Sequence, residues 1–118
     1  LSSAVDAALR ADAVVYAISP FGRGDVANQA ARIGEGALLK MTDQTGGTVF
    51  FIPPTADARQ EAVALDSAYQ RIVDELRAQY VLAYYSTERA RDGRFREVRV
   101  EVRRPGLTVR ARKGYYAK

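Results

Sequence analysis

The chain has 118 residues, which suits a single domain, and its 47% hydrophobic and 27% charged residues exclude a largely disordered protein. Cysteine and histidine are both absent, which excludes disulfides, zinc sites of the usual Cys/His kind, cysteine nucleophiles and imidazole bases. The net charge of +4 is uneven: residues 1–85 carry 7 Lys/Arg against 10 Asp/Glu (−3), and residues 86–118 carry 11 against 4 (+7).

The first two thirds of the chain alternate between helical and strand patterns. In chain order we expect a helix over 1–11, a strand over 13–19, loop over 20–36 with a short helical turn near 26–33, a helix over 36–47 stopped at Gly46, a strand over 48–52, and a helix from about Asp57 to Tyr80. Both strands are nearly continuous apolar runs, which are typical of parallel strands buried on two faces. The last helix carries one apolar stripe, which we expect to lie on the core: Leu65, Tyr69, Ile72, Val73, Leu76 and Tyr80.

After Tyr80 the period of the pattern changes from 3.6 to 2, which favours antiparallel strands. We expect strands over 80–86, 95–104 and 107–113, with turns at Asp92-Gly93 and Pro105-Gly106. A two-residue turn at Pro105-Gly106 would place Arg104 opposite Leu107, and every following pair is then fixed. Those pairs are Val102 with Val109, Val100 with Ala111, and Glu101 with Arg110, leaving one dry face and one charged face.

These patterns predict an α/β fold: a partial doubly wound, Rossmann-like parallel sheet with flanking helices, extended by a C-terminal antiparallel β-meander. Residues 1–118 form one domain or domain fragment, with an α/β part over 1–79 and an antiparallel extension over 80–118. No apolar run approaches the roughly 20 residues that span a bilayer. The chain starts at Leu1 without an initiator methionine or signal-peptide pattern, so we expect an excised or processed piece.

Five segments, in this order and spacing, resemble the C-terminal half of von Willebrand factor A-related domains, most closely the bacterial subfamily first grouped from acidobacterial proteins. They are "ADAVVYAIS", "LLKMTDQTGGTVFF", "RIVDELRAQYVLAYYS", "DGRFREVRVEV" and "RPGLTVRARKGYYA". The resemblance covers about residues 1–117. It implies a doubly wound sheet, a non-catalytic protein-interaction or adhesion-like role, and a secreted or extracytoplasmic bacterial protein.

The family's function usually resides in a Mg²⁺ site built on an Asp-x-Ser-x-Ser loop, and oxygen ligands of that kind suit Mg²⁺. No such motif occurs in the 118 residues, and the nearest pattern, Ser2-Ser3 ahead of Asp6, lies on an expected helix. None of the family's metal ligands is therefore assigned here. No cofactor is expected in this chain, and Mg²⁺ belongs to the parent protein only if an upstream loop supplies the motif.

Two glycine-rich stretches match nucleotide-binding patterns only weakly. "GRGDVA" (22–27) fits G-x-G-x-x-A but lacks the acidic residue after the next strand, so a plain loop is favoured. It also contains an Arg-Gly-Asp tripeptide, to which we assign no receptor role. "GEGALLK" (34–40) lacks the spacing of a phosphate loop and is interpreted as a helix start.

Catalysis is the least favoured class of function. Asp74 and Glu75 are adjacent on a helix and point about 100° apart, so they cannot flank one bond as an acid/base pair. Asp92 belongs to a turn, where aspartate is usually structural. No nucleophile–base set remains, and the sequence predicts a protein that is not an enzyme.

The basic tail leaves two interpretations open. Arg99, Arg103, Arg110 and Arg112 would project together on the charged face as a candidate interaction surface. Interspersed glutamates and the resistance of charged faces to aggregation favour a solvated, partly ion-paired surface. The alternative is a polyanion-binding module for nucleic acid or an acidic surface, helped by tyrosines that stack on bases. Nucleic acid is the disfavoured partner, because adjacent tyrosines such as Tyr84-Tyr85 place their rings on opposite faces.

An open sheet edge is the last expectation. A sheet fragment would leave the strand near Ala13–Ile18 without a neighbour on one side. We expect self-association or strand exchange to cover this edge. The protein partner of the interaction role is not identified by the sequence.

Overall fold

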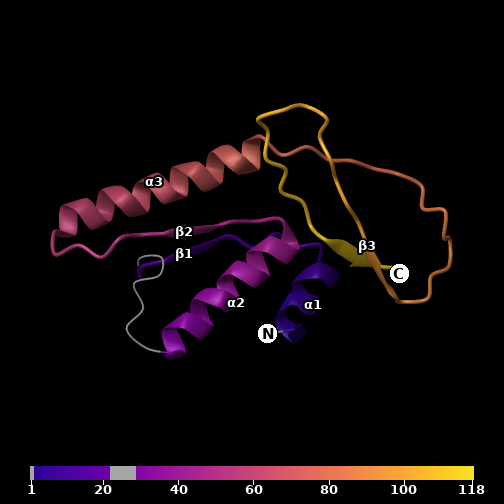
Figure 1. Ribbon diagram of the computed structural model, residues 1–118, viewed down its shortest axis with the longest axis horizontal. Coiled ribbons are helices and arrows are strands. Elements are labelled where there is room, and N and C mark those ends of the chain that lie inside the picture. The colour runs from indigo at the N-terminus through magenta and orange to yellow at the C-terminus, as the bar shows by residue number, and fades with distance from the viewer. Residues whose placement is uncertain (1, 22–28) are drawn as a thin grey trace.

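The computed structural model describes residues 2–21 and 29–118. Its elements in chain order are α1 (Ser2–Arg10), β1 (Ala17–Ser19), α2 (Gln29–Thr45), β2 (Val49–Phe51), α3 (Ala58–Arg77), β3 (Phe95–Glu97) and β4 (Gly114–Tyr116). Figure 1 shows α1, α2 and α3 beside the β1–β2 pair, with the C-terminal third spread out at one end. The fold is therefore mixed α/β, as expected.

The β1–β2 pair is parallel, in agreement with the two continuous apolar runs. Ala17 lies opposite Val49, and Ser19 lies opposite Phe51. Before the ladder begins, the chains are so close that a β-carbon on Gly47 would stand 1.8 Å from the Val15 carbonyl oxygen. Glycine is therefore required at position 47 by close backbone approach.

Helix α2 is longer than the sequence pattern predicts. The helix begins at Gln29, so the helical turn expected near 26–33 is, from residue 29 on, part of the same helix as 36–45, and the expectations of loop at 34–35 and of a helix start at Gly34–Lys40 are wrong. Gly34 and Gly36 lie inside the helix, where each costs about 1 kcal/mol relative to alanine. The two glycines concealed the helix in the sequence.

The C-terminal end of α2 is a junction for distant segments. The Thr45 hydroxyl accepts a 3.0 Å hydrogen bond from the Val15 backbone N–H, and Thr45 is 1% exposed. Gly46 has a φ of 85°, so the left-handed stop predicted there is confirmed. The backbone of 111–112 lies against Gly46, and the Gln44 carbonyl accepts a 3.0 Å bond from Lys113 N–H.

Helix α3 begins where expected but exposes most of its apolar stripe. Asp57 caps its N-terminus by accepting a 2.9 Å bond from Arg59 N–H. Only Ala68 is buried, and the Arg71 guanidinium lies 4.8 Å from the centre of the Phe50 ring. The exposed members of the expected stripe are Leu65, Tyr69, Val73, Leu76 and the following Tyr80. The prediction that this stripe lies on the core is wrong, because the two-stranded sheet is too narrow to cover it.

The predicted strand over 80–86 is not formed: these residues belong to no helix or strand, and no strand of the described residues pairs with them. In Figure 1 the chain leaves α3 and continues away from β2 instead of turning back along it. The antiparallel part is therefore one pair, β3–β4, and not a three-stranded meander.

The predicted hairpin register is confirmed, although most of the predicted ladder is not formed. Glu97 lies opposite Gly114 and Phe95 opposite Tyr116, which continues the predicted pairing of Val100 with Ala111. Gly106 has a φ of 81° at the predicted turn. One more bond, from Val98 N–H to the Lys113 carbonyl at 2.8 Å, extends the pairing before the two limbs separate.

The open limbs leave the predicted dry face exposed. Val102, Leu107 and Val109 are 49%, 57% and 37% exposed, so the expectation of a dry face is wrong. The return limb is held on the body of the molecule near Gly46, and this draws it away from the outgoing limb.

The C-terminus packs on the first helix. The Tyr116 hydroxyl donates a 2.7 Å bond to Asp6, the Arg10 guanidinium lies 3.8 Å from the centre of the Tyr116 ring, and Lys118 Nζ donates to the Arg10 carbonyl at 2.7 Å. The buried apolar residues are few: Val5, Leu9, Phe50, Ile52, Ala68 and Ala117. The radius of gyration is 16.9 Å, against about 13 Å for a compact domain of 100 residues. The molecule is elongated and exposes much apolar surface.

Within the described residues, no helix is both long and apolar enough to cross a membrane. The "GRGDVA" stretch at 22–27, with its Arg-Gly-Asp tripeptide, lies outside the described residues.

Candidate interaction surface

Both strands of the parallel pair have an edge without a neighbouring strand in the described part of the chain. Ala17 N–H bonds to the Thr48 carbonyl, and the Ser19 carbonyl accepts from Ile52 N–H, so these residues point their polar backbone groups inward. Because this direction alternates along a strand, Ile18 directs its N–H and C=O to the free edge of β1. Hydrogen-bonding capacity at such an edge is a template for another strand.

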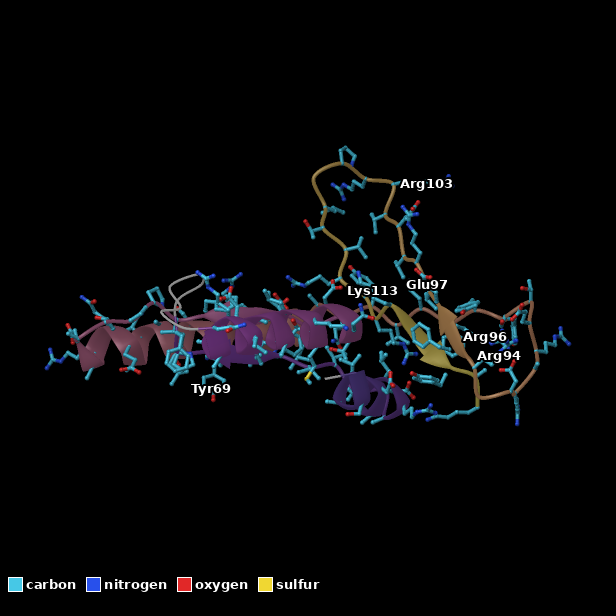
Figure 2. All side chains as sticks on the ribbon, turned by 60° about the horizontal axis from the view of Figure 1, so that its bottom comes forward. Tyr69, Arg94, Arg96, Glu97, Arg103 and Lys113 are labelled. Atoms are coloured by element: carbon cyan, nitrogen blue, oxygen red, sulfur yellow. The ribbon has the colours of Figure 1, made fainter. Side chains whose placement is uncertain are left out.

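Exposed apolar side chains surround the sheet and continue beyond it. On α3, Leu65, Tyr69 and Leu76 are 39%, 56% and 48% exposed. Figure 2 labels Tyr69 on this helix. Figure 1 shows α3 on the β2 side of the parallel pair, and a row of large half-exposed side chains on such a helix is typical of a protein-interaction surface.

The four arginines predicted to form one surface are divided between the tip and the base of the open hairpin. Arg103 lies at the tip, which Figure 2 shows standing away from the rest of the molecule, with Glu97 and Lys113 near its base. The Arg99 side chain is 84% exposed and pairs with Glu101 at 2.7 Å. The tip is therefore exposed and basic, and Glu101 pairs with Arg99 instead of Arg110.

The other two arginines fasten the return limb to the body. Arg110 pairs with Glu75 of α3 at 2.5 Å, and Arg112 pairs with Asp12 at 2.5 Å. Both arginine side chains are 45% exposed. The structure thus separates Arg110 and Arg112, which pair with the body of the molecule, from Arg99 and Arg103 on the outgoing limb of the hairpin.

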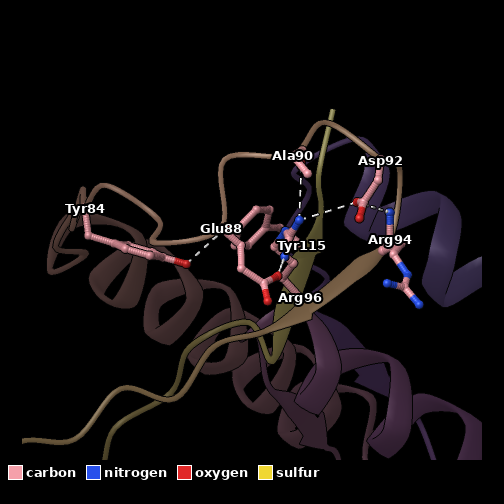
Figure 3. Close-up of polar contacts among 7 residues, drawn as sticks. All are labelled: Tyr84, Glu88, Ala90, Asp92, Arg94, Arg96 and Tyr115. Carbon is pink, nitrogen blue, oxygen red and sulfur yellow. Dashed lines mark hydrogen bonds and ion pairs between the residues drawn. The ribbon is translucent and has the colours of Figure 1, made fainter.

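A second cluster, around Arg96 of β3, is one that the sequence patterns did not indicate. Its guanidinium pairs with Glu88 and Asp92 and donates to the Ala90 carbonyl at 3.0 Å, and its side chain is only 13% exposed (Figure 3). The ion pairs of Glu88 and Asp92 with Arg96 hold the loop that carries these two carboxylates against β3. Spacings of four residues suggest contact only on a helix, so this strand-and-loop arrangement had no recognisable sequence signal.

Tyr84 and Tyr115 meet beside this cluster, as Figure 3 shows. The Tyr84 hydroxyl donates a 3.2 Å hydrogen bond to the Tyr115 hydroxyl. As donor in this bond, Tyr84 has a raised pKa, whereas the pKa of Tyr115 is lowered by the bond that it accepts. Together the tyrosine pair and the Arg96 cluster join the 84–92 segment to the β3–β4 pair.

An open hollow of about 560 Å³ lies under this segment, and it includes side chains of Tyr84, Arg89, Arg91, Arg96 and Lys118. Its most enclosed cation, Arg96, is already neutralised by two carboxylates. The hollow therefore lacks the buried, unpaired polar group that would fix a small molecule.

The structure brings together no metal or acid/base constellation in the residues it describes. No group of three or more His, Cys, Asp or Glu side chains is placed to hold a metal ion within 2–21 and 29–118. Asp74 is exposed, and Glu75 is engaged by Arg110. The two carboxylates thus have different surroundings and do not face a common site.

No protein-family model, no curated protein and no solved structure matches the chain.

Proposed function

We propose that this chain is a non-catalytic protein–protein interaction module, corresponding to the C-terminal part of a von Willebrand factor A-like domain from an exported bacterial protein. In this proposal the β1–β2 pair is part of a larger doubly wound sheet. The module binds an unidentified partner, or another copy of itself, by adding a strand to its open sheet. The observation that carries the proposal is the free edge of β1 at Ile18.

Strand addition at this edge has a physical basis. A partner strand would satisfy the outward N–H and C=O of Ile18 and would cover the half-buried Ile18 side chain further. Ser19 is buried and Ile18 half-buried, so the end of the edge is already part of an ordered sheet. A preformed edge lowers the ordering cost of binding.

The test uses immobilised protein and the extracytoplasmic proteins of the source cells. Ile18→Pro removes the outward N–H, which an edge strand tolerates, while Ile18→Val keeps it. We expect wild type and Ile18→Val to retain a common protein that Ile18→Pro loses, with at least a tenfold weaker affinity for the purified partner. Equal retention by all three proteins would contradict strand addition at β1. Circular dichroism checks that Ile18→Pro remains folded.

A second candidate function, polyanion binding, is favoured by the exposed position of Arg99 and Arg103 at the open hairpin. Phosphate contacts by such arginines weaken steeply with salt. The probe is a labelled single-stranded oligonucleotide at low and moderate salt, with Arg99→Ala/Arg103→Ala as the variant. Salt-sensitive binding that this variant loses would support the candidate, and no binding at low salt would eliminate it.

A further inference from the structure

The segment 80–86, which the sequence pattern predicts to be a strand, belongs to no helix or strand of the structure and has no backbone partner in its described part. Within the described residues, no backbone–backbone hydrogen bond involves any residue from 80 to 91. In Figure 1 the chain after α3 runs along the outside of the C-terminal third. Its backbone donors and acceptors are therefore free to pair with another strand.

The side chains of this segment are exposed on both faces. Tyr80, Val81 and Tyr85 are 93%, 95% and 98% exposed, and Leu82 and Tyr84 are 72% and 62% exposed. Aromatic and β-branched residues have high strand propensity, and the seven residues carry no charge. An extended, uncharged apolar strand at a surface is an association site.

The segment is held in place at both ends. At its start, Ala78 N–H caps α3 by bonding to the Asp74 and Glu75 carbonyls. Near its end, Tyr84 bonds to Tyr115, and Arg96 fixes the following loop through Glu88. Pairing with a second strand therefore requires little further ordering of the backbone.

We propose that the segment 80–86 binds the same segment of a second copy of this chain, as an antiparallel pair about a two-fold axis at Ala83. This deepens the proposed interaction function by naming a second surface and its occupant. A two-fold interface uses the same patch on both copies, so one exposed segment is enough to build it.

Symmetry restricts the register of this pair. Opposite residues in an antiparallel pair alternate between hydrogen-bonded and non-hydrogen-bonded positions, so a two-fold axis must pass through a residue that faces itself. Centring on Ala83 pairs the whole segment: Val81 with Tyr85, Leu82 with Tyr84, and Tyr80 with Ser86. The smallest side chain lies at the axis, and every large apolar residue but Tyr80 faces another. Because a two-stranded ribbon is marginally stable in water, we expect a weak dimer that forms at high protein concentration.

The experiment exploits the absence of cysteine from the chain. Ala83→Cys places one thiol at the axis, where opposite Cα atoms lie within disulfide range, and we expect oxidation to give a covalent dimer. Val81→Cys and Tyr85→Cys test the register: their mixture should cross-link at least tenfold faster than either alone. Ala62→Cys, on an exposed position of α3, is the matched control and should remain monomeric.

Sedimentation at high concentration tests the dimer without a cross-link. Ala83→Pro deletes a backbone donor on both copies and should raise the dissociation constant about tenfold or more, whereas Ala83→Ser keeps the donor. A wild-type protein that sediments as a monomer throughout, or an Ala83→Cys variant that cross-links no faster than Ala62→Cys, would overturn the proposal. Ile18→Pro should leave this dimer unchanged, so failure here is distinguishable from failure of strand addition at β1.

Discussion

At the scale of single residues, the structure depends on a few positions where only one side chain fits. Gly47 is the strictest, since the Val15 carbonyl oxygen occupies the place of its β-carbon at 1.8 Å. Thr45 follows, because its hydroxyl accepts the Val15 N–H at a site 1% exposed to solvent. Two residues on either side of Gly46 thus position β1 against β2: Gly47 by having no side chain, and Thr45 through its hydroxyl.

The two kinds of glycine should respond in opposite ways to substitution. Gly47→Ala forces β1 and β2 apart and should lower the free energy of unfolding by about 1–3 kcal/mol. Gly34→Ala, in α2 with nothing within 4 Å of the added carbon, should raise it by about 0.5–1 kcal/mol. Urea denaturation measures both. A neutral Gly47→Ala would mean that the close approach at Val15 is absent in solution.

At the scale of elements, sequence patterns identified the parallel pair, the start of α3 and the hairpin register, because each depends on local spacing or on turn chemistry. The patterns failed at α2, where two glycines concealed a helix whose stability comes from neighbours. They also failed on the arginines. The alternation of polar and apolar residues predicts on which face of a strand the Arg110 side chain lies. It does not predict that Glu75 of α3 forms an ion pair with Arg110.

The anchoring role of these arginines gives a second prediction. Arg110→Ala/Arg112→Ala removes two partly exposed ion pairs, so the free energy of unfolding should fall by only about 1 kcal/mol in total. The return limb should nevertheless detach more often, and chymotrypsin, which cleaves after large apolar residues such as Leu107 and not after arginine, should cleave the hairpin several times faster. Arg103→Ala, at the free tip, is the control. Equal protection of the hairpin in both variants would show that the ion pairs do not hold it.

At the scale of the whole molecule, a narrow sheet leaves apolar surface that a larger assembly would cover. The sequence patterns predict that the apolar stripe of α3 is buried and that the apolar segment 80–86 forms a strand. In the structure the side chains of both are mostly exposed. Burial depends on what lies beside an element, which local pattern does not report. The radius of gyration of 16.9 Å expresses the same openness.

Polar substitution on α3 tests this openness in dilute solution. Leu76→Gln, at a side chain 48% exposed, should change the free energy of unfolding by no more than about 0.5 kcal/mol. Ala68→Gln, at a residue 5% exposed, should lower it by about 1–3 kcal/mol through overpacking. If Leu76→Gln lowered the free energy of unfolding as much as Ala68→Gln, the apolar stripe of α3 would be buried in the monomer. That result would contradict a two-stranded sheet that leaves the stripe exposed.

The contact between Tyr116 and Asp6 also has a consequence for biosynthesis. These partners are 110 residues apart, and Lys118 closes on Arg10 beside them. During synthesis, α1 can pack on α2 as soon as α2 has emerged, but its cover is incomplete until residues 114–118 have been translated. The contact between Tyr116 and Asp6 closes a loop of 110 residues, which is a slow step. A nascent chain arrested before Gly114 should accordingly expose α1 to chaperones.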